Sequence, residues 1–320
     1  MRPRLRLPLL ALLASLMTLP AHAAWPERGV RIIVPFPAGG PADNSTRVVA
    51  KRLAELWGKP VVVENRPGAA GMVAGANAAP DGYSLILGAG SHIVTAPLMN
   101  PKMAYVPMRD FAPVSLILTN TPVITVHPGT GIKTLRELIA YAKAKPGTLN
   151  YSSAGMGSPG HLTMEMLTDL TQTNMVHVPY KGGAPAVAEL VGGHVQLGVN
   201  ATPTVLQHIQ TGKLTALAVA STRRDRSLPQ VPTTAEAGVN NLGYYIWYGL
   251  FAPAKTPRDI VNRVSADVQK VLAEPAIAET IRIQGGDPEG ASPEKFKQMI
   301  EDDIAVWARL IREKKLTLEE

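Results

Sequence analysis

Residues 30–57 read VRIIVPFPAGGPADNSTRVVAKRLAELW and contain the unit from which the fold is built. The apolar run at residues 30–35 predicts a buried strand, because it is short, rich in β-branched residues and followed by glycine and proline. A helix is predicted over residues 45–57, where Val49 and Leu53 recur at the spacing of one helical face. A strand that passes through a Gly/Pro turn into a helix is typical of α/β proteins.

The same alternation of strands and helices continues along most of the chain, which predicts an α/β fold with largely parallel sheets. Further strands are predicted at residues 61–64, 84–88, 122–126, 149–152, 175–178, 195–199, 214–220 and 244–253. Further helices are predicted at residues 71–79, 135–143, 185–191, 204–211, 257–272 and 293–314. A length of 320 residues favours two domains. We expect the chain to cross between them near residues 122–128 and 222–232.

The first 23 residues have the pattern of a secretory signal. Three arginines precede a leucine-rich run over residues 7–19, and the segment ends in Ala21-His22-Ala23. The apolar run is short for a membrane span, which needs roughly 20 residues. Cleavage is therefore predicted after Ala23, and the mature protein is expected to be soluble in the periplasm.

Composition excludes several classes of protein. The net charge of +7 falls to +4 once the three signal-peptide arginines are removed, since 29 Lys and Arg then face 25 Asp and Glu. No block of five like charges occurs and only 5% of residues are aromatic, so no nucleic-acid partner is predicted. The absence of cysteine excludes disulfides, cysteine nucleophiles and cysteine-based metal sites.

Three glycine-rich turns each follow a predicted strand and are expected to open a helix. They cover residues 35–43, 152–161 and 179–185. In open α/β sheets ligands bind beyond the carboxyl ends of the strands, which is where such turns lie. The start of a helix offers unpaired N–H groups and a partial positive charge, and glycine lets a ligand approach the backbone. The three turns are therefore predicted to hold a small carboxylate together.

The second turn contains two patterns that do not develop into a site. Gly155, Gly157 and Gly160 fit G-x-G-x-x-G, but the acidic residue expected about 20 positions later is absent, which argues against a dinucleotide site. His161 and Glu165 are four residues apart and are interpreted as a helix-surface pair, because no third metal ligand is evident. Met156 is expected to serve packing. No metal and no cofactor are predicted.

Several motifs in one order then give a resemblance that covers essentially the whole mature chain. They are VPFPAGGPAD at residues 34–43, VENRPGA at 63–69, PDGY at 80–83, HVPYKG at 177–182 and EAG at 236–238. The chain closely resembles the Bug family, the TctC-like substrate-binding proteins associated with tripartite tricarboxylate transporters.

The resemblance implies a two-domain periplasmic-binding-protein fold of type II, in which each lobe is a mostly parallel sheet flanked by helices. It places residues 24–124 and 228–320 in lobe 1 and residues 125–227 in lobe 2. It further implies a non-enzymatic receptor that closes on a small organic acid or related polar metabolite. The partners would be the permease subunits of a tripartite tricarboxylate transporter, and the receptor is expected to be a monomer.

Carried over position by position, the resemblance implies a set of ligand-binding residues in which backbone N–H groups predominate. They are Phe36, Ala38, Gly39, Gly40, Asp43, Ser91, Ser153, Gly155, Gly157, Ser158, Tyr180, Lys181 and Gly182. Asn200 is added because the family often has aspartate there, and a neutral amide would shift the preference toward a more acidic ligand if it reached the cleft. From the residues alone, Asp43 either caps a helix or contacts the ligand.

Two alternatives remain open at this stage. The protein could be a sensor component that signals ligand occupancy to a membrane kinase. It could also be a secreted serine hydrolase using Ser153 or Ser158, although neither serine has the glycines of G-x-S-x-G around it.

Overall fold

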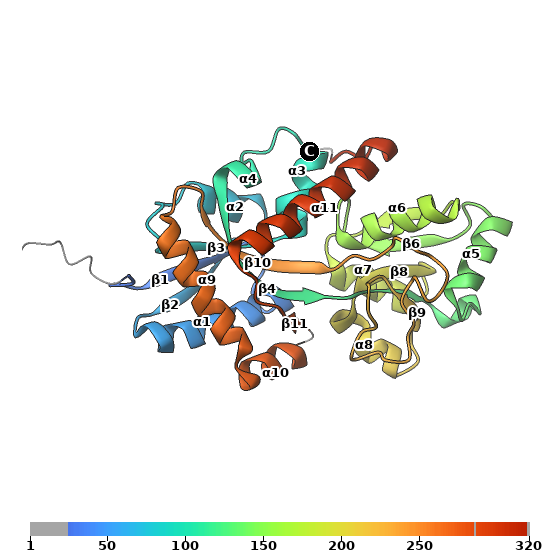
Figure 1. Cartoon of the computed structure of the whole chain (residues 1–320). Helices are drawn as coiled ribbons and strands as arrows, with labels where there is room; N and C mark the ends of the chain where they lie inside the picture. The colour runs from blue at the N-terminus through green and yellow to red at the C-terminus, as the bar shows by residue number, and fades with distance from the viewer. Residues whose placement is uncertain (1–24, 285, 319–320) are drawn as a thin grey trace, which may run out of the picture.

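A computed structural model describes residues 25–284 and 286–318, which form two lobes with one β-sheet each (Figure 1). The predicted signal peptide lies outside the described residues. Within the described part of the chain, no helix combines the length and the apolar character needed to cross a membrane.

The first lobe contains a six-stranded sheet in the order β11-β4-β10-β3-β1-β2. Its strands are β1 (Val30–Val34), β2 (Val61–Asn65), β3 (Ser84–Ala89), β4 (Phe111–Asn120), β10 (Ile246–Pro253) and β11 (Asp287–Pro288). Its helices are α1 (Pro41–Trp57), α2 (Ala69–Ala76), the π-helix η1 (Ser91–Thr95), α3 (Ala96–Met99), α4 (Pro107–Asp110), α9 (Arg258–Ala273), α10 (Pro275–Ile283) and α11 (Pro293–Lys314).

The second lobe contains a five-stranded sheet in the order β7-β6-β8-β5-β9. Its strands are β5 (Pro122–Val126), β6 (Asn150–Ser153), β7 (Val176–Pro179), β8 (Leu197–Ala201) and β9 (Thr215–Val219). Its helices are the short 3-10 turn η2 (Pro128–Thr130), α5 (Leu135–Ala144), α6 (Pro159–Thr171), α7 (Gly183–Val191) and α8 (Thr202–Gln210).

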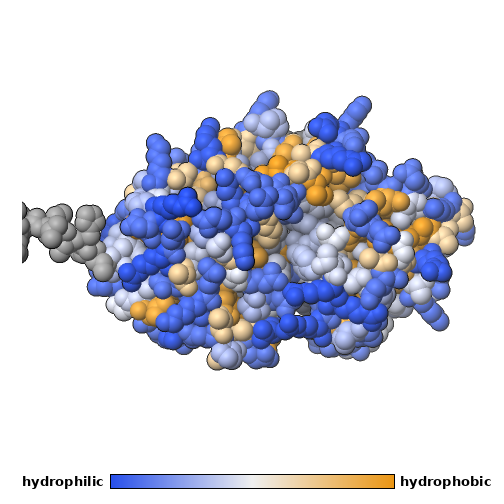
Figure 2. All heavy atoms as spheres, in the orientation of Figure 1, coloured by the Kyte–Doolittle hydropathy of each residue, from blue (hydrophilic) through white to orange (hydrophobic). Residues whose placement is uncertain are grey.

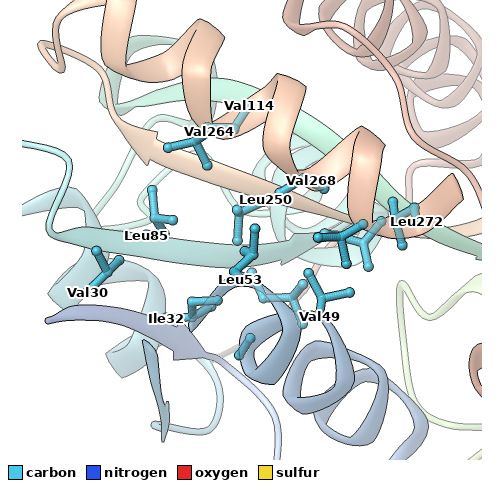
Figure 3. Close-up of a cluster of buried hydrophobic side chains, with 14 of the residues drawn as sticks. Val30, Ile32, Val49, Leu53, Leu85, Val114, Leu250, Val264, Val268 and Leu272 are labelled. Atoms are coloured by element: carbon cyan, nitrogen blue, oxygen red, sulfur yellow. The ribbon is translucent and has the colours of Figure 1, made fainter. Parts of the chain in front are cut away.

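The helix of the opening unit begins earlier than predicted, at Pro41 instead of residue 45. Proline fits the first turn of a helix because its missing N–H would have no partner there. The helix ends at Gly58, which adopts a left-handed conformation with φ 62°. Val49 and Leu53 are fully buried. Figure 3 shows their side chains in one core together with Val264 and Val268 of α9. The early start of α1 brings its first turn next to the first glycine-rich loop.

Both sheets are mixed, and the expectation of mostly parallel sheets is wrong. The β1–β2, β1–β3, β6–β7 and β6–β8 pairs are parallel, as the repeated strand-and-helix units require. The strands β4, β5 and β10, which adjoin the crossings between the lobes, pair antiparallel with their neighbours. Strands β5 and β10 enter a lobe from the other one and run against the direction of its βαβ units. Strand β4 is antiparallel to β10 and therefore runs in the same direction as β3.

The chain passes from β4 to β5 through Thr121, close to the first predicted crossing. The sequence predicts the second crossing near residues 222–232. Leu228 and Val231 pack in a cluster with Val123 of the second lobe, and Val239 and Leu242 pack in the other core of that lobe. Because residues 228–242 bury their apolar side chains there, we propose that the second lobe extends to about residue 242 and not to 227.

The lobes also touch away from the crossings. Lys314, at the end of α11, pairs with Asp169 on α6 at 3.2 Å. The hydroxyl of Thr95 in the first lobe donates to the Gly157 carbonyl in the second, at 2.9 Å. Figure 2 shows pale and orange residues gathered between the lobes, whereas polar residues cover most of the rest of this face. The contacts at Thr95 lie beside the cavity described next.

Candidate ligand-binding site

A cavity of about 810 Å³ lies between the lobes, and residues from all three glycine-rich loops line it. Nine of the predicted site residues are part of its wall: Phe36, Ala38, Gly39, Gly40, Ser91, Gly157, Ser158, Lys181 and Gly182. The structure therefore brings together in space loops that lie far apart in the sequence. Five other predicted residues, Asp43, Ser153, Gly155, Tyr180 and Asn200, are not among the lining residues.

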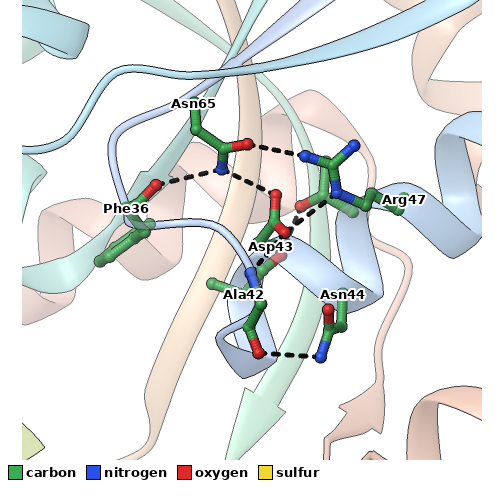
Figure 4. Close-up of polar contacts among 8 residues, drawn as sticks. Phe36, Ala42, Asp43, Asn44, Arg47 and Asn65 are labelled. Carbon is green, nitrogen blue, oxygen red and sulfur yellow. Dashed lines mark hydrogen bonds and ion pairs between the residues drawn. The ribbon is translucent and has the colours of Figure 1, made fainter.

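The first loop is held by the buried carboxylate of Asp43 (Figure 4). It accepts hydrogen bonds from the Gly39 N–H at 2.9 Å, Arg47 Nε at 3.0 Å and Asn65 Nδ2 at 2.7 Å. Asn65 Nδ2 also donates to the Phe36 carbonyl at 3.1 Å. Burial alone would raise the pKa of Asp43, but these hydrogen bonds and the Arg47 charge outweigh it and hold the pKa below its ordinary value. Asp43 is therefore an ionised support beneath the loop.

The second loop is supported by a stack of three rings behind it. The ring of His177 lies between Tyr151 and His161, with ring centroids 4.8 Å and 4.2 Å away. His161 is only 2% exposed, so its interpretation as a helix-surface residue is wrong. Its Nδ1 accepts a hydrogen bond from the Gly157 N–H at 3.1 Å, which places its proton on Nε2, toward Glu165 at 3.9 Å. The buried histidine thus fixes the turn that faces the cavity.

Neither serine of the second loop is presented as a nucleophile. The Ser153 hydroxyl is buried, lies 2.6 Å from His177 Nε2 and accepts from the Gly155 N–H at 3.1 Å. Ser158 lines the cavity, but its hydroxyl accepts from the His161 N–H and caps α6, and Pro159 follows at the first position of the helix. Both hydroxyls are committed to loop structure.

The three glycines of the second loop are required by the backbone geometry and not by a ligand motif. Gly155 and Gly157 have φ values of +125° and +71°, which favour glycine. Gly160 has ordinary torsions, but a Cβ there would lie 2.4 Å from the Val199 carbonyl oxygen on β8. The G-x-G-x-x-G spacing therefore arises from a tight turn and from the close approach of α6 to the sheet.

Gly160→Ala is expected to lower the free energy of unfolding by about 1–3 kcal/mol, because α6 must move away from β8. Gly183→Ala is the matched control, since a Cβ at Gly183 meets nothing within 4 Å. Urea unfolding of both variants measures the difference. Equal stability of the two variants would show that the close approach at Gly160 is unimportant.

The third loop presents Lys181 and turns Tyr180 away. The Gly182 N–H donates to the Ala154 carbonyl at 3.2 Å, which joins the third loop to the second. Tyr180 directs its hydroxyl toward Glu189 on α7, at 3.5 Å. Lys181 is exposed, lines the cavity and forms no ion pair with another described residue. Among the described residues that line the cavity, Lys181 carries the one charged side chain.

Asn200 lies within β8, opposite Val123 of β5, and is 7% exposed. Its Nδ2 has no hydrogen-bond partner among the described residues. Its side chain faces the second-lobe core near Gly198 and is not part of the cavity wall. The effect on ligand preference suggested by the sequence stays a prediction.

Several lining residues were not predicted. The largest are Tyr244, Ile246 and Tyr248, which adjoin the second crossing, and Leu318, which follows α11. Met156 also lines the cavity and is 41% exposed, so the expectation that it serves packing is wrong. The alternation Tyr244, Ile246, Tyr248 is a usable signal, because every second residue of an extended segment faces the same side.

Stability is expected to fall as the pH falls from about 6.5 to 4. Burial lowers the pKa of His92 from 6.5 to about 4. Burial and the neighbouring His161 lower the pKa of His177 from 6.5 to about 4 as well. Burial also lowers the pKa of His161. The unfolded chain then binds more protons than the folded one in this range, so the contribution is complete above 6.5 and is lost on acidification.

Urea unfolding at pH 7 and pH 4.5 should differ by about 2 kcal/mol or more. His177→Gln should reduce this difference, whereas His194→Gln, at a side chain that is 67% exposed, should preserve it. A stability that stays constant over the range would contradict the burial of neutral histidines.

Comparison with known proteins identifies the family. The model of the tripartite tricarboxylate transporter family receptor, TctC, matches residues 45–316. The chain belongs to this family. It is 36% identical over 293 residues to protein BugT of Bordetella pertussis, covering 90% of each chain. The resemblance stated from the sequence motifs is thereby confirmed.

Solved structures of TctC-like proteins confirm the two-lobe fold. One is Rpa4515 of R. palustris with adipate, with a TM-score of 0.81 and 33% identity, covering 90% of this chain and 97% of that one. Another is MatC of Rhodopseudomonas palustris with bound malate, with a TM-score of 0.78 and 31% identity, covering 90% and 100%. This TctC-family chain is a periplasmic solute-binding receptor.

Proposed function

We propose that this receptor binds a small organic acid in the cavity between its lobes and holds the carboxylate at Lys181 and the start of α7. The observation that carries the proposal is an unpaired cationic side chain in a cavity lined by both lobes. Two similar proteins have adipate and malate in their structures, which supports a carboxylate as the ligand class.

The start of α7 suits an anion. Its cap is Gly182, with φ +116°, and no side chain caps the helix or places an acid in its first turn. The first N–H groups of such a helix are without intrahelical partners, and the helix dipole adds a partial positive charge. Lys181, one residue before that cap, adds a full charge to the same place.

We further propose that the chain is exported and cleaved after Ala23, and that it acts as a monomer that delivers its ligand to the permease subunits of a tripartite tricarboxylate transporter. Family membership supports the delivery role. The sensor and hydrolase alternatives gain no support from the arrangement of the site.

A thermal-shift screen of the mature protein tests the ligand class. Mono-, di- and tricarboxylates are compared with their neutral amides, and each compound is titrated from none to a large excess over the protein. An acid at about 100 times its dissociation constant should stabilise the protein by about 2.7 kcal/mol, and its amide should not. A shift produced by neutral compounds and by no acid would contradict the proposal.

A further inference from the structure

The charge in the cavity wall is confined to one described residue, Lys181. Lys181 marks one part of its wall, whereas Phe36, Ile246, Tyr248 and Leu318 form another part that is largely apolar. Phe36 packs edge-on against Tyr248, with ring centroids 5.6 Å apart, so these two rings form one apolar surface. A carboxylate placed against that surface would lose its hydration without gaining a cation.

Resident anions lie behind the apolar part. Asp43 is ionised beneath the first loop, accepts from the Gly39 N–H and lies in the first turn of α1, where its charge offsets the helix dipole that would otherwise favour a second carboxylate. Asp303 accepts from Trp247 Nε1 at 2.6 Å, and its charge helps to raise the pKa of the buried Tyr244. The Arg47 cation is already paired with Asp43, so a second ligand carboxylate would find no free cation in this part of the described structure.

The two tyrosines contribute neutral donors only. Burial raises the pKa of Tyr248 to about 12 and that of Tyr244 well above its ordinary value. Both line the cavity, and neither hydroxyl forms a hydrogen bond with another described residue. A neutral hydroxyl can donate one hydrogen bond to a ligand but brings no charge to offset the desolvation of a carboxylate.

The apolar part is completed by the segment after α11. The Leu318 N–H donates to the Met99 carbonyl of the first lobe at 3.2 Å. Its side chain reaches the second lobe, where Cδ2 lies 3.8 Å from the position that a Cβ on Gly157 would take. Leu318 therefore lies at the rim where the two lobes meet and lines the cavity from that side.

Resting on the function proposed above, we infer that the ligand is a monocarboxylate with an apolar body, and that Leu318 determines specificity for that body. The carboxylate lies at Lys181 and the start of α7. The body lies against Phe36, Ile246, Tyr248 and Leu318.

Hexanoate and adipate form a matched pair of probes, because they have the same chain length and differ by one carboxylate. Isothermal titration calorimetry with the mature protein should give hexanoate at least about tenfold the affinity of adipate. Equal or tighter binding of adipate would overturn this inference and leave the carboxylate receptor intact. Binding of hexanamide without either acid would overturn the proposed function as well.

A gain of function provides the second test. Leu318→Arg adds a cation at the apolar end, so the preference should move toward adipate by about tenfold or more. Ile283→Arg adds the same charge at a side chain that is 79% exposed and outside the cavity, and it should leave the preference unchanged. An identical preference in both variants would show that Leu318 does not contact the ligand.

Discussion

Lys181→Gln is expected to weaken the binding of a carboxylate ligand by about 10- to 100-fold, while the protein remains folded. A hydrogen bond to a charged group contributes about 1.5–3 kcal/mol, and every 1.4 kcal/mol is a factor of ten. The side chain makes no ion pair with another described residue, so its loss removes little from the folded state. Calorimetric titration with the acid that gives the largest thermal shift measures the change.

Two comparisons isolate the charge at Lys181. Lys213→Gln removes a cation from an exposed position outside the cavity and should leave the affinity as it is. The amide of the same acid should bind wild type and Lys181→Gln equally, because it carries no charge. An unchanged affinity of Lys181→Gln for the acid would place the carboxylate elsewhere.

Asp43→Ala is expected to lower the free energy of unfolding by about 2–4 kcal/mol. The substitution removes three hydrogen bonds to a buried carboxylate and leaves the Gly39 N–H and Asn65 Nδ2 with fewer partners. Because Arg47 is 47% exposed, water solvates its freed guanidinium and limits the cost. The first loop should also loosen, so ligand affinity should fall with stability.

The effect of Asp43→Ala should depend on pH. The pKa of this carboxyl is lowered from 3.8 in the folded state, so its stabilising contribution is present above 3.8 and is lost as the pH falls through the folded value. The difference between wild type and variant should therefore shrink below about pH 3.8. Glu313→Ala, which breaks an exposed pair with Arg309, should cost less than about 1 kcal/mol. A comparable cost for both variants would contradict the role assigned to Asp43.

The sequence was sufficient to locate the loops of the site. Glycine and proline mark where strands end and helices begin, and parallel strands place those turns at one edge of a sheet. The turns at Gly157 and Gly182 lie together for this reason, and the packing of the two lobes brings the turn at Gly39 to the same cavity. The cap of α6 at Ser158 was equally predictable, because Ser-Pro is a local signal that needs no knowledge of the rest of the chain.

Features that depend on distant contacts escaped prediction. The strand β4 contains Pro113, which sits where the pairing with β10 shifts register, so its sequence lacks a regular pattern. His161 reads as a polar helix residue until the stack with His177 is known. Leu318 lines the cavity only because α11 carries the end of the chain back across the lobes, and no local motif records that path.

A crystal structure with the acid that gives the largest thermal shift tests the central claim most directly. We predict that the acid lies between the lobes, with its carboxylate within hydrogen-bonding distance of Lys181 Nζ and the first N–H groups of α7. A second hollow, of about 690 Å³, lies on the second lobe and is lined by Lys133 and Arg136. If the acid were bound in that hollow and not in the cavity between the lobes, the proposed binding site at Lys181 would be wrong.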